Sequence, residues 1–137
     1  MALNKGYLQA KTDKESDEIY TPAYAVKPIL KYIPKDNIVW CPFDTEDSEY
    51  VKLIQKNGNE VIFSHIDEGK NFFFYEPKKY DCIISNPPFS LKDEILKRLY
   101  ELNKPYAMLL PIPSLQGQKR FLYIKDCEAL IFDKRIN

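Results

Sequence analysis

The chain has 137 residues, of which 45% are apolar and 29% charged, as in an ordinary soluble globular protein. This length favours one compact domain and is short for an enzyme with a separate substrate domain. Because no apolar run could span a membrane and the N-terminus lacks the apolar core of a signal peptide, we expect a cytoplasmic protein without a membrane partner.

The charges balance, with 20 basic and 20 acidic residues. A dedicated nucleic-acid binder usually has a basic excess, so we expect any intrinsic affinity for nucleic acid to be weak. Three cysteines, Cys41, Cys82 and Cys127, each fall in an apolar run, without a CxxC spacing and with only one histidine in the chain. This pattern argues against a zinc site and predicts reduced, buried thiols.

In chain order, the polar residues 1–17 predict a flexible N-terminal arm, and residues 18–137 a single domain. "YTPAYAVKPILKYIP" predicts a helix with Thr21 as its cap and Pro22 at the first helical position. Pro28 conflicts with an unbroken helix and predicts a kink or a restart.

Apolar runs predict five strands, and segments with helical periodicity between them predict three further helices. The strands are expected at residues 37–41, 60–66, 80–85, 105–111 and 127–133, and the helices at residues 46–59, 91–104 and 114–126. Gly58 marks the stop of the first of these helices. The aromatic run Phe72, Phe73 and Phe74 lies in a loop, and at least one of its rings should face solvent or a partner.

Strands that alternate with helices predict an α/β fold with a mostly parallel sheet and helices on both of its faces. Ligands of such sheets bind beyond the carboxyl ends of the strands, so the loops after residues 41, 65, 85 and 110 matter most.

The third predicted strand runs directly into Asn86-Pro87-Pro88-Phe89. Because proline holds the preceding residue extended, this stretch forms a stiff platform for the Asn86 amide and the Pro87 carbonyl. Two such oxygens can accept hydrogen bonds from one exocyclic amino group, and the planar group that carries it could stack on Phe89. The alternative interpretation is a plain proline turn that ends a strand.

"NPPF" after "YDCIIS" resembles the [DNS]-P-P-[FYW] motif of S-adenosylmethionine-dependent N-methyltransferases, chiefly the adenine-N6 DNA enzymes and their small phage or prophage relatives. "YTPAYAV" is similar to the family's segment before the first strand, and the resemblance covers roughly residues 19 to 132. It implies a Rossmann-like class I methyltransferase sheet, S-adenosylmethionine as cofactor and a flipped adenine in DNA as substrate. Asn86, Pro87, Pro88 and Phe89 would form the catalytic site, where Asn86 and Pro87 accept hydrogen bonds from the amine and Phe89 stacks on the base.

The resemblance also implies a set of cofactor-binding residues. Those residues are Tyr20, Thr21, Pro22, Pro42, Phe43, Asp44, His65, Asn71 and Phe72. Asp44 would bind the cofactor's ammonium group, and the alternative is that the acidic run 44–49 caps a helix. His65 stands where the family has an acidic ribose ligand, and a structural histidine is the alternative.

The chain departs from the family pattern at three places. Thr45 and Asp47 replace the glycines of the cofactor loop, and no closing hairpin or target-recognition region fits. The spacing between His65 and Asn71 leaves no room for a helix and a full strand, so one crossover should be missing or much shortened. We therefore expect a reduced fold in which a specificity subunit or a homodimer supplies DNA contacts. The alternatives are a degenerate domain that acts through a partner, or a methyltransferase for RNA or protein glutamine.

Overall fold

A computed structural model describes residues 21–133 and residue 136, so the predicted N-terminal arm lies outside the described part. Within that part, four parallel strands form one sheet in the order β2-β1-β3-β4. The strands are β1 (Ile38–Cys41), β2 (Glu60–Phe63), β3 (Cys82–Ser85) and β4 (Tyr106–Met108). The predicted α/β fold with a parallel sheet is confirmed.

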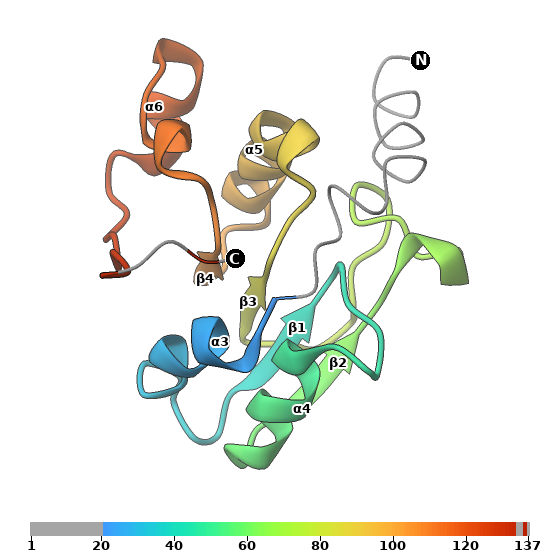
Figure 1. Cartoon of the computed structure of the whole chain (residues 1–137). Coiled ribbons are helices and arrows are strands. Elements are labelled where there is room, and N and C mark those ends of the chain that lie inside the picture. Colours follow the sequence, from blue (N-terminus) through green and yellow to red (C-terminus); the bar gives the residue numbers. More distant parts are fainter. Residues whose placement is uncertain (1–20, 134–135, 137) are drawn as a thin grey trace.

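Helices cover both faces of this sheet (Figure 1). The α-helices are α3 (Ala23–Leu30), α4 (Glu49–Lys56), α5 (Lys92–Leu102) and α6 (Gln118–Ile124), and the 3-10 helices are η1 (Ile66–Glu68), η2 (Phe89–Leu91) and η3 (Ile112–Leu115). The arrangement is that of a reduced Rossmann-like sheet.

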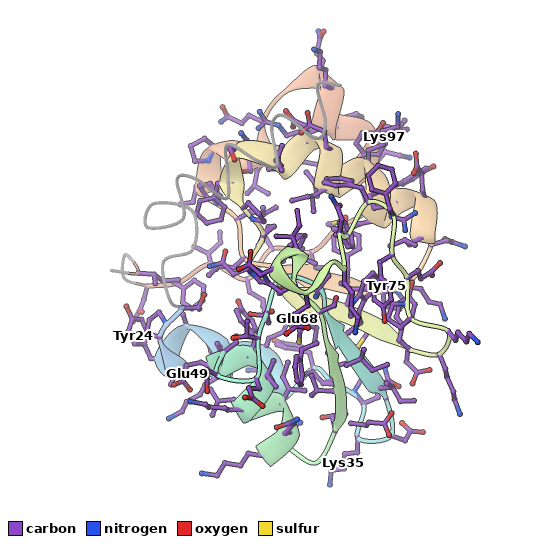
Figure 2. All side chains as sticks on the ribbon, turned by 90° about the vertical axis from the view of Figure 1, so that its right-hand side faces the viewer. Tyr24, Lys35, Glu49, Glu68, Tyr75 and Lys97 are labelled. Carbon is purple, nitrogen blue, oxygen red and sulfur yellow. The ribbon has the colours of Figure 1, made fainter. Side chains whose placement is uncertain are left out.

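Alternate residues of the strands point to opposite faces of the sheet and pack into two separate hydrophobic cores. Trp40 and Ile83 pack on the face covered by α5, where Ile95, Leu96 and Leu99 are buried. Val39 and Ile84 pack on the opposite face against α3 and α4. Figure 2 shows Tyr24 and Glu49, which belong to the first turns of α3 and α4, on the same side of the molecule.

The first helix differs from the prediction at its start. α3 begins at Ala23 after Pro22, and no side chain caps it, so the predicted role of Thr21 as a cap is wrong. The hydroxyl of Thr21 accepts a hydrogen bond from a residue far along the chain instead. The helix also runs through Pro28 and ends at Leu30, because a proline this close to the last turn interrupts little of the helix.

The connection from β2 to β3 contains η1 and turns but no α-helix, so the predicted shortened crossover is confirmed. The aromatic run in this connection divides as expected. Phe72 is completely buried, Phe73 is half-buried, and the side chain of Phe74 is 71% exposed.

The predicted fifth strand is wrong, since residues 128–133 form neither helix nor strand. Its apolar residues Leu130 and Ile131 are exposed, and β4 has no strand partner on its outer side within the described part of the chain. The prediction that all three cysteines are buried is wrong for the same region: Cys41 and Cys82 are buried, but Cys127 is exposed. A run with strand propensity forms a strand only where it finds a pairing partner.

Candidate active site

The predicted motif residues meet at the carboxyl end of the sheet. Because β1 and β3 are adjacent and parallel, the loop that begins at Pro42 and the stretch that begins at Asn86 leave the sheet at the same edge. Leu109 N donates to the Ser85 carbonyl at 3.3 Å, which brings the end of β4 to the same edge. This edge is the place where ligands of open parallel sheets bind.

The stretch Asn86–Pro88, hereafter the acceptor platform, is rigid and well packed. Pro87 and Pro88 are buried, and Pro88 is extended with φ −60° and ψ 119°. The Pro88 carbonyl accepts a hydrogen bond from Leu91 N at 3.1 Å, so η2 begins directly after the platform. Phe89 is half-buried at the start of η2.

The two polar atoms of the Asn86 side chain differ: one makes a hydrogen bond and the other has no partner among the described residues. Its Nδ2 donates to Thr21 Oγ1 at 2.8 Å, although the two residues are 65 positions apart in sequence. Its Oδ1 is buried and has no hydrogen-bond partner in the described part of the chain. Because a buried acceptor without a partner is unfavourable, this oxygen is the natural place for a donor from a ligand.

The carboxylate of Asp44 lies between the loop after β1 and the end of β3. Ser85 Oγ donates to its Oδ2 and Ser48 Oγ to its Oδ1, both at 2.5 Å. Asp44 N donates to the Ser64 carbonyl at the end of β2, at 3.2 Å. Ser48 itself precedes α4 and makes no side-chain cap, while Asp44 links the loop after β1 to the ends of β2 and β3.

The buried carboxylate affects two neighbouring side chains. Burial, followed by the charge of Asp44, raises the pKa of the Cys41 thiol and of the Tyr50 hydroxyl. Both groups are therefore neutral near pH 7.

Thr45 and Asp47, which stand at the two glycine positions of the family pattern, are both exposed. The last acidic residue of the run, Glu49, opens the first turn of α4, where negative charge is favourable. The loop thus combines a buried carboxylate at its base with exposed side chains at the two glycine positions.

The remaining predicted cofactor residues have local structural partners. His65 is buried, and its Nδ1 accepts a hydrogen bond from Asp67 N at 3.1 Å at the start of η1. That Nδ1 also lies 3.4 Å from a carboxylate oxygen of Asp67, so His65 and Asp67 are neighbours at the start of η1. Asn71 Oδ1 accepts from Phe73 N at 2.9 Å, in a turn of the chain's own backbone.

Phe72 does not border an open surface, in contrast to what the resemblance implies. Its ring packs against Trp40 and Phe43, with centroids 5.5 and 5.1 Å away, and the side chain has no exposed surface. This packing favours a core role for Phe72, whereas Phe43 is only half-buried.

The structure thus brings Thr21, Asp44 and Asn86 together with the ends of β1, β2 and β3, and it leaves Asn71 and Phe72 in the neighbouring connection. Tyr20 lies outside the described residues. Sequence analysis missed the serines 48, 64 and 85 that bind Asp44. A signal for Ser85 exists, because it is the polar last residue of an otherwise apolar strand, directly before the motif.

A surface hollow of about 460 Å³ lies elsewhere, lined by residues 76–81 and Lys104. These residues precede β3 and β4, so the hollow is at the amino end of the sheet. It is separate from the acceptor platform and contributes nothing to the candidate site.

Of three comparisons with known proteins, one found a similar protein, and it is a methyltransferase. No protein-family model matches the chain, and no solved structure matches it significantly. The chain is similar to the type II methyltransferase M.EcoRI of Escherichia coli, with 25% identity over 177 residues of alignment that cover 91% of this chain and 54% of that protein. No helix in the described part of the chain is long and apolar enough to cross a membrane.

The chain therefore spans about half the length of the curated relative it matches. Since the alignment is longer than the 137 residues of this chain, the relative also has inserted segments that this chain lacks. The chain thus has a parallel α/β fold and is similar in sequence to one methyltransferase.

Proposed function

We propose that the protein is an S-adenosylmethionine-dependent methyltransferase that acts on an exocyclic amino nitrogen, and that this nitrogen is adenine N6 in DNA. The observation that carries the proposal is the buried Asn86 Oδ1 without a partner at the carboxyl end of β3. The similarity to a type II methyltransferase supports the same reaction class.

The acceptor platform would act by holding the amine. Asn86 Oδ1 and the Pro87 carbonyl accept one hydrogen bond each from the two N–H groups, which orients the nitrogen lone pair toward the methyl donor. S-adenosylmethionine supplies a methyl group on a positively charged sulfur. With that group bound, the nitrogen held by Asn86 and Pro87 would form its bond to the methyl carbon as the carbon–sulfur bond breaks, and the amine would then lose one proton to solvent.

Phe89 would supply the stacking surface for the base. Its half-buried ring directly follows Pro88, so a planar heterocycle whose amino group lies on the platform can contact the ring face. An adenine inside a duplex cannot reach such a site, so the substrate base must be flipped out.

The loop after β1 fits the cofactor's polar end. The buried carboxylate of Asp44 suits an ammonium group, and two hydroxyls already stabilise its charge. Thr45 and Asp47 are both exposed, and we propose that the missing glycines therefore do not block the loop. We assign the cofactor's polar end to the loop after β1, at Asp44 and the half-buried Phe43, with Pro22, Pro42, His65 and Asn71 as the residues that would border it.

The balanced charge of the chain suggests how DNA would be engaged. With 20 residues of each sign, phosphate contacts from this chain are few, and we propose that a specificity subunit or a second copy adds them. The proposal is tested against three alternatives. The protein could methylate RNA, it could methylate a protein glutamine, or it could be a non-catalytic domain that acts through a partner.

The test compares methyl transfer from labelled S-adenosylmethionine by the wild type and by Asn86→Ala, on adenine-containing single-stranded and duplex DNA, RNA and a glutamine peptide. We predict transfer to DNA, and a loss of at least about 100-fold in Asn86→Ala with unchanged cofactor affinity, because the amine loses an acceptor used in the transition state.

The matched control is Gln55→Ala, which removes an exposed amide on α4 and should keep full activity. Transfer to RNA or to the peptide alone would change the substrate class. Full activity of Asn86→Ala would remove Asn86 from the mechanism.

A further inference from the structure

Two side chains hold the acceptor platform from neighbouring segments of the fold. We infer that Thr21 and Ser85 are positioning residues that clamp this platform through the hydrogen bonds Thr21–Asn86 and Ser85–Asp44. The inference rests on the proposed function, and it gives Thr21 a role different from the cofactor contact that the family resemblance implies.

The first contact holds the side-chain amide of Asn86 beside Thr21. Because a hydroxyl can donate as well as accept, this contact restricts the amide's rotation, and a donor at Oδ1 then selects the orientation with Nδ2 toward Thr21. Nδ2 donates to Thr21 Oγ1 at 2.8 Å, which leaves Oδ1 as the atom without a partner. A rotation of the amide by 180° would put an NH2 group in the position of Oδ1. That NH2 group cannot accept a hydrogen bond from the amino group of a substrate, so the orientation of this amide decides whether the platform works.

The second contact fixes the backbone just before Asn86. Ser85 is completely buried, and its Oγ donates to Asp44 Oδ2 at 2.5 Å across 41 positions of sequence. Asp44 is itself bound to the Ser64 carbonyl through its backbone N–H. The start of the platform is therefore tied to the ends of β1 and β2.

Proline completes the clamp on the other side. Pro87 and Pro88 restrict the backbone after Asn86, and η2 begins at Phe89. With Ser85 fixed before the platform and the prolines after it, the rotation of the Asn86 side chain is the freedom that remains, and Thr21 restricts it. Thr21 lies two residues before α3, so the helix carries this anchor.

The first test uses the isosteric change Thr21→Val, with Thr21→Ser as the variant that keeps the hydroxyl. In the protein without ligand, the Asn86 side-chain NH2 signal in NMR should shift in Thr21→Val and its protons should exchange faster with water. At saturating cofactor, kcat should fall about 10- to 100-fold, since misplacement of a positioning group costs that much. Thr21→Ser should restore both readouts.

An unchanged Asn86 amide signal in Thr21→Val, together with a loss of cofactor affinity at constant kcat, would overturn the inference and return Thr21 to the cofactor site. The NMR readout needs no methyl transfer. A wild-type protein that is inactive on every substrate, yet shows the shifted amide in Thr21→Val, would refute the proposed function and keep the clamp.

The second test compares Ser85→Ala with Ser48→Ala. Each change removes one hydroxyl from the same Asp44 carboxylate, but only Ser85 is joined to the platform. We expect Ser85→Ala to lower kcat at saturating cofactor about 10-fold, whereas Ser48→Ala, which loosens only the carboxylate that we assign to the cofactor, should raise the KM for cofactor more than it lowers kcat. Equal losses of kcat in the two variants would show that activity depends on the Asp44 loop and not on the link from Ser85 to the platform. If Ser85→Ala does not fold, the comparison of Thr21→Val with Thr21→Ser tests the inference by itself.

Discussion

The residues beneath the candidate site form a connected polar group inside the sheet. Trp40 Nε1 donates to Ser64 Oγ at 2.9 Å in the buried interior, while the backbone carbonyl of Ser64 accepts from Asp44 N. Ser64 thus joins the large core indole to the loop that we assign to the cofactor. A single small hydroxyl residue links core packing to site geometry.

This link predicts a stability effect. Ser64→Ala leaves the Trp40 indole N–H buried without an acceptor, so the free energy of unfolding should fall by about 1–3 kcal/mol. Urea denaturation measures it, and Thr45→Ala, an exposed change in the loop after β1, is the control that should stay within about 0.5 kcal/mol. A Ser64→Ala protein as stable as the control would show that the hydrogen bond contributes nothing.

At the scale of elements, pairing decides which predicted segments became strands. "NIVWC" and "CIIS" lie in the centre of the sheet, where both faces are covered, and they formed β1 and β3 as predicted. Residues 127–133 have the same apolar character, but they remain irregular with Leu130 and Ile131 exposed. Local propensity predicts a strand, whereas the partner that stabilises it is a property of the whole fold.

The cysteines in the paired strands are buried and the one in the irregular segment is exposed, which predicts which of them react. Burial, followed by the Asp44 charge for Cys41, raises the pKa of the thiols of Cys41 in β1 and Cys82 in β3, so both stay protonated and enclosed at pH 8. Since the thiolate is the nucleophile, iodoacetamide should label only the exposed Cys127 in the native protein. Mass spectrometry counts the labels, and labelling in guanidinium should give all three; rapid native labelling of Cys41 or Cys82 would contradict the buried placement.

At the scale of the whole molecule, sequence patterns predicted the layered α/β architecture, because alternating strand and helix periods leave few ways to bury their apolar faces. They also predicted the site edge, because the carboxyl ends of parallel strands meet there. They could not predict that Thr21 reaches Asn86, or that Ser85 reaches Asp44, since contacts across 65 and 41 positions depend on tertiary packing. For the same reason the local sequence predicts Thr21 as a helix cap, and the family resemblance implies a ligand contact for Phe72, whose ring is packed in the core.

The central claim is that the carboxyl end of this small sheet is a methyl-transfer site, and every step of it requires the cofactor. The most direct measurement is a calorimetric titration of the protein with S-adenosylmethionine and with S-adenosylhomocysteine. We predict saturable one-to-one binding of both, with the loop after β1 holding the shared amino-acid end. Absence of binding at millimolar ligand would contradict the claim, and the acceptor platform would then be a rigid turn in a domain without methyltransferase chemistry.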